Sequence, residues 1–324
     1  MSDRFWRPST LDAIEHDLAA LWREVTKEGP VARAIMSNLV VVRTPRSQWP
    51  ERRVGVSIDA VAAQHPSRVV IIDHESIATG APGPTGARVG VALFGPPQAR
   101  YAVEQIAVHS AGLDESLPSL VRRLVRGGLP ISTWWAEDCS EAPLIASILE
   151  MGRQLVYDSR RWTNIERGVE VIHAWRHLDL ADVNWRRLVA MRRALVVAAA
   201  GEPMDWSPDT IRIAHDADYR AQAWLLAGWL ASRLDWPPHV APRIEAAADP
   251  NTVLSVTIGN GERTVRVNCD GRRVVVMHPG RPPSTIGIPI EGEADAVSAE
   301  LHSLSHDVRL HDALSALHRI FSAS

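Results

Sequence analysis

The chain has 324 residues, of which 46% are hydrophobic and 23% are charged, a balance typical of globular domains. A single hydrophobic core rarely serves more than about 250–300 residues, so we expect two domains. The formal net charge of −3 provides no basic field for nucleic acid or for an anionic membrane surface, and we expect neither as a partner.

Three features of the sequence favour a cytoplasmic protein. The first six residues contain no apolar signal segment. The longest apolar run without a charge, residues 221–232, is too short to cross a bilayer as a helix. The two cysteines, Cys139 and Cys269, cannot build the disulfide framework of a small secreted protein.

The N-terminal part of the chain alternates helical and strand-like segments. Residues 9–25 begin with a Ser/Thr cap and repeat apolar residues at helical spacing, whereas residues 35–44 form a β-rich apolar run. By the same criteria further helices are predicted at 57–66, 115–128, 142–151, 164–176 and 183–199, and further strands at 67–73, 88–95, 101–112, 129–135 and 153–159. The strands at 88–95 and 101–112 are expected to pair antiparallel. The pattern predicts an α/β N-terminal domain with a mixed sheet flanked by helices.

The pattern changes after residues 201–209, which are rich in Pro and Gly, so we place the domains at 1–203 and 204–324. Residues 216–238 form a helix that is apolar nearly all round and is therefore expected to be central. Strand-like runs follow at 251–260, 263–270, 272–280 and 284–290, before one or two helices over about 295–322. Turn signals at Gly259-Asn-Gly and Asp270-Gly271 indicate hairpins. The second domain is thus predicted to be α+β with an antiparallel sheet.

Motifs of known chemistry are largely missing from this sequence. The Gly-rich stretch 79–90 contains two prolines, lacks Gly-Lys-Ser/Thr and precedes a strand, so we interpret it as a surface connection and not as a phosphate loop. No Gly-x-Ser-x-Gly nucleophile motif occurs. His302, His306 and His311 lack the glutamate of a zinc protease motif and are interpreted as surface or helix-packing residues. We therefore predict no catalytic residue, no metal and no cofactor.

Two groups of basic residues are candidates for binding an anion or a partner. Arg186 and Arg193 are seven residues apart and share one helical face, where they could hold a phosphate or the carboxylates of another protein. A solvated helix face with local ion pairs explains them equally well. His65 and Arg68 lie between a helix end and a strand start, a place that could present both side chains together or simply form a turn.

The stretch GLPISTWWAEDC, residues 128–139, places two tryptophans at the end of a predicted strand. Adjacent strand residues point to opposite faces, so Trp135 shares a face with Ile131, and Trp134 shares one with the small polar Ser132. Both rings can be core in a sheet that is covered on both faces. The alternative is a docking surface formed by Trp134 with Glu137 and Asp138 in the loop after the strand, where open α/β sheets carry their sites.

Several segments, in this order and spacing, resemble the OpcA family, the glucose-6-phosphate dehydrogenase assembly proteins of bacteria. They are residues 32–42, 65–73, 104–112, 117–135, 155–162, 183–195 and 223–236. The resemblance covers nearly the whole chain. It implies two domains and a non-catalytic partner that binds glucose-6-phosphate dehydrogenase, promotes its active oligomer and so supports NADPH production in the oxidative pentose phosphate pathway.

The chain departs from the family pattern in two ways. Val42 and Ala102-Val103 stand where some members carry cysteines linked to redox control, so thiol switching is not expected here. The helix before the tryptophan pair carries arginines, which indicates a changed partner surface. A different class of function also stays open: a sugar-phosphate-binding enzyme or metabolite sensor that uses Arg68, Arg186 and Arg193 as anion ligands.

Overall fold

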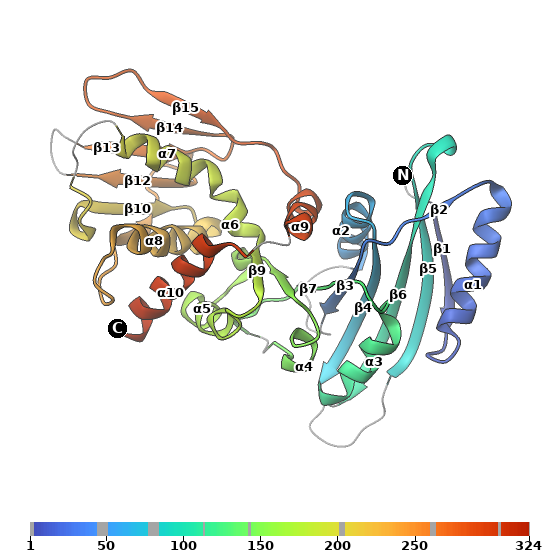
Figure 1. Ribbon diagram of the computed structural model, residues 1–324. Coiled ribbons are helices and arrows are strands. Elements are labelled where there is room, and N and C mark those ends of the chain that lie inside the picture. The colour runs from blue at the N-terminus through green and yellow to red at the C-terminus, as the bar shows by residue number, and fades with distance from the viewer. Residues whose placement is uncertain are drawn as a thin grey trace. The chain divides into compact units, whose positions relative to one another are not determined.

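A computed structural model describes residues 3–43, 51–76, 84–112, 114–141, 144–200, 205–259, 264–303 and 306–323 (Figure 1). The chain divides into two compact units. The first comprises residues 1–137, 144–157 and 292–305, and the second comprises residues 138–143, 158–291 and 306–324. Each unit has its own sheet and its own helices.

The sheet of the first unit has the strand order β1-β5-β6-β4-β3-β7-β8, and β2 pairs with β6. The strands are β1 (Asp3–Ser9), β2 (Ala32–Arg33), β3 (Ser37–Arg43), β4 (Ser67–Ser76), β5 (Pro84–Phe94), β6 (Tyr101–Gly112), β7 (Ile131–Trp135) and β8 (Gln154–Tyr157). The β1–β5 and β5–β6 pairs are antiparallel and the remaining pairs are parallel. The predicted mixed sheet is confirmed. Its central strand β3 is a continuous apolar run, Leu39 to Val42, because both of its faces are buried.

Helices of the first unit bury one face each. They are α1 (Ile14–Val25), α2 (Glu51–Gln64), α3 (Leu117–Leu124), α4 (Ala146–Leu149) and α9 (Glu293–His302), with short 3-10 turns η1 (Thr26–Glu28), η2 (Pro97–Ala99) and η3 (Asp114–Ser116). Ile14, Leu18, Leu21 and Val25 form the buried stripe of α1, which packs against β5. The late helix α9 lies beside α2 (Figure 1), so residues far apart in the sequence complete this unit.

The second unit contains a sheet with the order β11-β10-β12-β13-β14-β15. Its strands are β10 (Ile211–His215), β11 (Arg243–Ala246), β12 (Leu254–Ile258), β13 (Val265–Cys269), β14 (Arg273–Met277) and β15 (Ser284–Gly287). All neighbours pair antiparallel except β10 with β11. The hairpin at Asp270-Gly271 is confirmed: Gly271 has φ +87°, which glycine adopts at little cost, and Asp270 accepts hydrogen bonds from the backbone N–H groups of Arg272 and Arg273. The predicted α+β architecture is confirmed.

A buried helix, α8 (Arg220–Leu234), is the centre of the second unit, as its sequence predicts. The other elements are β9 (Asp179–Asp182), α5 (Ile165–Ala174), α6 (Val183–Arg187), α7 (Val189–Ala199) and α10 (Val308–Ser322), with 3-10 turns η4 (Ser159–Arg161), η5 (Pro208–Thr210) and η6 (Ala217–Tyr219). Helix α10 packs closely on α8 at Gly228, where a Cβ would lie 2.5 Å from both Ala313 O and Leu317 Cγ. A side chain at position 228 would therefore force the two helices apart.

The structure differs from the sequence-based expectation at several elements. The strands β1, β2, β9, β10 and β11 were not predicted, and the helix expected at 183–199 is divided at Leu188 into α6 and α7. Helix α7 packs on β13 and β14, and α5 packs on α10. The two units therefore divide the chain differently from the predicted domains 1–203 and 204–324, which stay a prediction. Residues 84–90 of the Gly-rich stretch, interpreted from the sequence as a surface connection, belong to strand β5, so that interpretation is wrong for them. Residues 79–83 of the stretch lie outside the described residues.

None of the described helices is both long enough and apolar enough to cross a membrane.

Candidate functional site

Both tryptophans of the predicted docking stretch lie in the core of the first unit. Trp134 is 2% exposed and Trp135 is 1% exposed. Strand β7 runs between β3 and β8, with Trp134 opposite Val41 on one side and Val156 on the other. A central parallel strand is covered on both faces, so neither ring offers surface to a partner in this structure.

Hydrogen bonds to Asp138 hold the acidic loop after β7 in place. Asp138 accepts from the backbone N–H and the hydroxyl of Ser140 at 2.8 and 2.7 Å, and from the backbone N–H of Thr163 at 2.8 Å. Glu137 is half-buried. Asp138 thus holds two segments of the second unit together, which occupies the carboxylate that the sequence suggested for docking.

His65 is buried at the end of α2. Its Nε2 lies 2.9 Å from the hydroxyl of Ser37, which in turn lies 2.8 Å from the hydroxyl of Ser67. The ring meets that of His302 edge-on, with centroids 4.6 Å apart. Burial, aided by repulsion from His302, lowers the pKa of His65 to about 4. The imidazole is therefore neutral near pH 7 and belongs to helix packing.

Arg68 lies at the centre of a buried charge network in the first unit. Its guanidinium is fully buried and donates to Glu104 at 2.8 Å and to Glu15. Glu104 is also fully buried and accepts further from the indole N–H of Trp22 at 2.8 Å and from Arg33. Because two carboxylates already neutralise Arg68, there is no room at this guanidinium for a phosphate.

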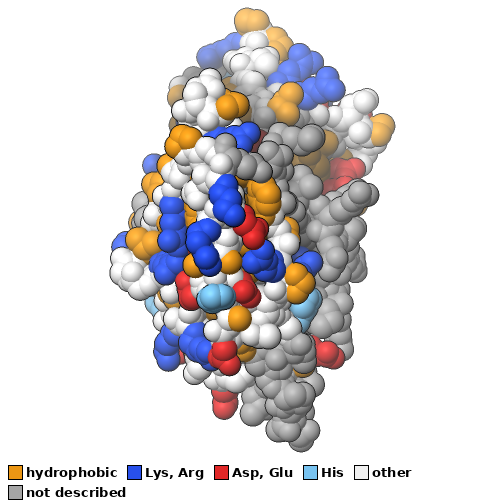
Figure 2. All heavy atoms as spheres, turned by 90° about the vertical axis from the view of Figure 1, so that its right-hand side faces the viewer, with side chains coloured by type: hydrophobic (Ala, Val, Ile, Leu, Met, Phe, Trp, Pro, Cys, Tyr) orange, Lys and Arg blue, Asp and Glu red, His pale blue; other side chains and the backbone are white. Residues whose placement is uncertain are grey.

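The surface of the first unit mixes the two signs of charge. Seen from the right-hand side of Figure 1, Lys and Arg side chains lie among Asp and Glu side chains (Figure 2). Ion pairs in this unit include Arg7 with Glu24 at 2.6 Å and Arg123 with Asp12 at 2.7 Å. On this face, acidic side chains of the described residues are thus interspersed with basic ones.

The two helical arginines of the prediction differ from each other. The Nε of Arg186 lies 2.9 and 3.0 Å from the carboxylate oxygens of Glu291, so Arg186 is paired. Arg193 is exposed on α7 and has no ion pair with any described residue. The next turn of α7 exposes two apolar side chains, Val196 at 61% and Val197 at 47%. Arg193 is thus the predicted anion or partner residue that is open to solvent.

Neither cysteine is poised for reaction. Cys139 and Cys269 are both buried, and neither forms a disulfide with a described residue. Burial is the main cause that raises the pKa of each thiol, and the negative charge of Asp138 adds to it at Cys139. A buried thiol that holds its proton is a poor nucleophile and a poor redox sensor.

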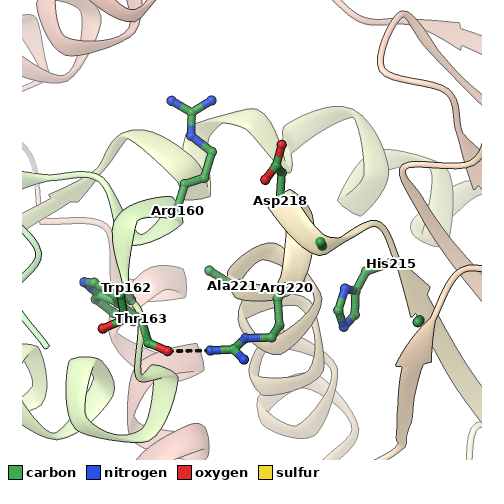
Figure 3. A pocket seen from close by; sticks show the side chains of 9 residues that line it. Arg160, Trp162, Thr163, His215, Asp218, Arg220 and Ala221 are labelled. Atoms are coloured by element: carbon green, nitrogen blue, oxygen red, sulfur yellow. Dashed lines mark hydrogen bonds between the residues drawn. The ribbon is translucent and has the colours of Figure 1, made fainter. Parts of the chain in front are cut away.

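The second unit has an open pocket of about 380 Å³ (Figure 3). Three segments meet there: the η4 turn and the residues after it, the stretch from the end of β10 into the first turn of α8, and the end of β11. Short-range caps fix the two turns. Asp158 accepts from the backbone N–H of Arg160, and Asp216 accepts from the backbone N–H of Asp218.

Basic groups surround this pocket. Arg220 donates to the backbone carbonyl of Thr163 at 2.7 Å, and Figure 3 shows it between Thr163 and His215. Arg160, on another side of the pocket, has its guanidinium 3.4 Å from the carboxylate of Asp158. His215 has Nδ1 2.8 Å from the carbonyl of Asp216; since a carbonyl only accepts, Nδ1 carries the proton.

A pair of buried carboxyl groups lies near the same turn. Asp182 accepts backbone N–H bonds from Ser159 at 3.1 Å and Asn184 at 2.9 Å through one oxygen, while its other oxygen is buried without a hydrogen-bond partner. Burial, with repulsion from Asp158, raises the pKa of Asp182 to about 7. Neither acid was among the site residues predicted from the sequence: Asp158 follows the short strand β8, and Asp182 ends the short strand β9.

The histidines and acids of the chain form no metal centre in its described part. Among the residues that the structure describes, no three His, Cys, Asp or Glu side chains converge to hold a metal ion. The rings of His306 and His311 lie with centroids 3.7 Å apart and planes tilted by 34°, and burial lowers the pKa of His311 to about 4. These histidines contribute to packing in the second unit.

Comparison with protein families gives two matches in chain order. Residues 58–174 match the N-terminal domain of the glucose-6-phosphate dehydrogenase subunit, and residues 178–314 match the C-terminal domain of the same protein. Both are OpcA domains. Together the two matches cover most of the chain.

Among curated proteins, the chain is similar to the OxPP cycle protein OpcA of two cyanobacteria. It is 31% identical to the Nostoc punctiforme protein over 133 residues, which are 38% of this chain and 28% of that protein. It is 25% identical to the Synechocystis sp. protein over 194 residues, which are 56% of this chain and 39% of that protein. The aligned region is thus well under half the length of these relatives.

Among solved structures, the super-repressor mutant of Gal80p from Saccharomyces cerevisiae has a TM-score of 0.48 and 10% identity, with 90% of this chain and 95% of that chain covered. A TM-score below 0.5 supports no inference about fold or function.

Proposed function

The chain belongs to the OpcA family of glucose-6-phosphate dehydrogenase subunits, and we propose that it is a non-catalytic factor that binds glucose-6-phosphate dehydrogenase and promotes its active oligomer. The proposal places the protein in the oxidative pentose phosphate pathway, in the cytoplasm. The observation that carries it is the match of both family domains, in order, over residues 58–174 and 178–314.

The arrangement of titratable groups supports a binding role. His65 and Arg68 are buried and form hydrogen bonds within the protein, and both thiols are buried. Asp138 accepts a hydrogen bond from the backbone of Thr163 and so holds two loops together. Catalysis needs reactive groups that can reach a substrate with matched pKa values. The candidate residues of this chain are instead used to hold its own structure together.

We further propose that the exposed part of α7 contacts the dehydrogenase. Val196 and Val197 are 61% and 47% exposed, and Arg193 lies one turn before them without an ion pair among the described residues. Apolar side chains next to an arginine are typical of the centre of a protein interface, where Arg is enriched and other charges are depleted. Burying the two valines against a partner would remove this apolar surface from water.

The experiment is an activity and assembly assay with the dehydrogenase of the same organism. Initial rates are measured across substrate concentrations with and without an excess of this protein, and the oligomer size is followed by light scattering after size exclusion. We expect no activity from this protein alone and a higher rate with a larger assembly when both are present. Unchanged rate, substrate affinity and size would overturn the proposal.

The contact surface is tested separately with the double variant Val196→Asp/Val197→Asp. Two unpaired charges in the core of an interface must be desolvated on binding, so they should weaken binding at least tenfold. Val308→Asp is the matched control, since Val308 is 59% exposed at the first turn of α10, where an acid is favourable. Equal affinity of the double variant and the control would exclude α7 from the interface while leaving dehydrogenase binding itself unaffected.

A further inference from the structure

The pocket of the second unit has the features of a site for a small anion, and neither the family match nor the proposed function uses it. Its volume of about 380 Å³ is at the lower end of the roughly 300–1,000 Å³ that small-molecule sites occupy. It therefore suits a small metabolite better than a dinucleotide.

Arg220 is the principal anion-binding group of the pocket. It is exposed, and among the described residues no carboxylate lies within ion-pair distance of it. Its one hydrogen bond, to the carbonyl of Thr163, uses one of the five N–H donors of a guanidinium. Asp218, the acid that also borders the pocket, points away from Arg220 in Figure 3. The free donors of Arg220 can therefore bind phosphate oxygens in the two-point geometry that guanidinium favours.

Two neighbouring groups strengthen the preference for an anion. Arg220 and Ala221 begin α8, a helix of 15 residues whose N-cap, Tyr219, makes no side-chain cap bond. The first turn of α8 borders the pocket and carries the positive end of the helix dipole. His215 directs Nδ1 to a backbone carbonyl, so Nε2 remains to accept from a ligand hydroxyl or, when protonated, to donate to a phosphate.

The rest of the lining is apolar and small. Ala217, Ala221 and Ala246 leave the space open, and the edge of Trp162 forms one wall. The Trp162 ring is buried and packs closely on Gly168, where an added Cβ would clash with it. A preformed apolar wall beside a cation matches a compact molecule with a carbon skeleton at one end and a phosphate at the other.

We propose that this pocket binds a small phosphate monoester, with the phosphate on Arg220 and the carbon skeleton against Trp162 and the alanines. The inference concerns this chain alone and does not depend on dehydrogenase binding.

The test is calorimetric titration of the purified full chain with glucose 6-phosphate, with inorganic phosphate and with glucose. We expect saturable binding of glucose 6-phosphate, weaker binding of inorganic phosphate because it lacks the skeleton, and no binding of glucose. Raising the salt concentration from about 0.05 to 0.5 M should weaken binding of the two anions, since exposed charges are screened.

Two variants locate the site. Arg220→Gln should weaken glucose 6-phosphate binding at least tenfold, whereas Arg266→Gln, which removes another exposed arginine of the same unit, should leave it unchanged. Ala246→Trp keeps every charge and fills the pocket, so it should also abolish binding. Melting temperatures of all three variants show whether each one is folded.

Three results would overturn the proposal. They are the absence of saturable binding by either phosphate probe up to 10 mM (about 10⁻² M, a very weak affinity), binding of glucose as tight as that of glucose 6-phosphate, and full binding by folded Arg220→Gln and Ala246→Trp. Activation of the dehydrogenase without phosphate binding would overturn this inference and leave the proposed function intact.

Discussion

Arg68 in the first unit and Arg220 in the second show opposite uses of the same side chain. Arg68 is fully buried and bonded to two carboxylates, whereas Arg220 is exposed at the rim of a pocket and bonded to one backbone carbonyl. A guanidinium stays charged in both places. The first therefore stabilises the fold by neutralising the buried Glu104, and the second keeps donors available for a ligand.

The contrast shows that the availability of a charge depends on contacts that are distant in the sequence. Glu104 is 36 residues from Arg68 and Glu15 is 53 residues away. Nothing in the local stretch His-Pro-Ser-Arg indicates these partners. Arg68, one of the three predicted anion ligands, is a core residue, whereas Arg220, at the start of an apolar helix and in no recognisable motif, is open to solvent.

The largest effect on stability is expected from substitution of Trp134 or Trp135, which lie in the core of the first unit. Trp134→Ala and Trp135→Ala should each lower the free energy of unfolding by about 3–5 kcal/mol, because each leaves a large cavity in the core. Urea unfolding measures the change. Trp224→Ala, at a half-buried position on α8, should cost less.

A variant that weakens dehydrogenase binding without lowering stability would contradict a purely structural role for that tryptophan. If Trp134→Ala left stability nearly unchanged and weakened dehydrogenase binding, Trp134 would be a docking residue. If the folded fraction of each variant binds with unchanged affinity, both rings act only through the fold.

Arg68→Met should lower the free energy of unfolding by about 3 kcal/mol, since it leaves Glu104 buried with fewer cations. We expect the lower end of the usual range because Arg33 and Arg126 remain within 4 Å of that carboxylate. Arg193→Met, which removes an exposed arginine, should change stability by less than about 0.5 kcal/mol. Equal losses of unfolding free energy in Arg68→Met and Arg193→Met would contradict the expectation that the buried arginine stabilises the fold more than the exposed one.

The pH dependence of stability should change in Asp182→Asn. The pKa of Asp182 is raised to about 7 in the folded protein, chiefly by burial, so the folded state holds a proton that the unfolded chain releases from about pH 4 upward. This group therefore makes the protein less stable as pH rises from about 4 to 7, by at most about 4 kcal/mol. Asn cannot ionise, so the variant should be more stable at pH 8 by about 2 kcal/mol, since part of the gain is lost to an unpaired amide.

His65 gives the opposite slope in the first unit and serves as the comparison for Asp182→Asn. Its pKa is lowered to about 4 by burial, so stability is full above about pH 6.5 and is lost as pH falls toward 4. Denaturant midpoints of wild type and Asp182→Asn, measured between pH 5 and 9, distinguish the contribution of Asp182 from that of His65. A parallel pH profile for wild type and Asp182→Asn would show that Asp182 is ionised in the folded protein.

The smallest effect is expected from thiol chemistry. Cys139 and Cys269 are buried and form no disulfide with a described residue, and burial raises the pKa of both thiols. Dithiothreitol should therefore change neither the melting temperature nor dehydrogenase activation. A redox response that disappears in Cys139→Ser/Cys269→Ser would contradict this expectation.

Sequence patterns predicted the apolar strands well and the polar ones poorly. The runs that became β3, β4, β7 and β8 are rich in β-branched residues, because central parallel strands are buried on both faces. The strands β1, β9 and β11 are short or rich in charges, so their sequences lack the apolar pattern that predicts a strand. The burial of Trp134 could not be predicted with certainty from its strand alone, because its covering neighbours come from distant segments.

The pocket could not be predicted because no single segment carries it. Arg160, Arg220 and Ala246 come from three stretches that each have an ordinary local pattern. Their convergence depends on how η4, α8 and β11 pack in the second unit. The acid caps at Asp158 and Asp216 were the available local signal, since they mark turns that hold their neighbours in place.

The discontinuous first unit has a consequence for biosynthesis. Helix α9, near the end of the chain, packs on α2, and the backbone carbonyl of Glu300 accepts from Gln154 on β8. These contacts cannot form while the chain is still being translated through residues 158–291. At about 5–20 residues per second, the nascent first unit must wait roughly 7–30 s on the ribosome for its last helix. During that interval the α2 surface is open to chaperones, and a chain stalled before α9 would release an incomplete first unit.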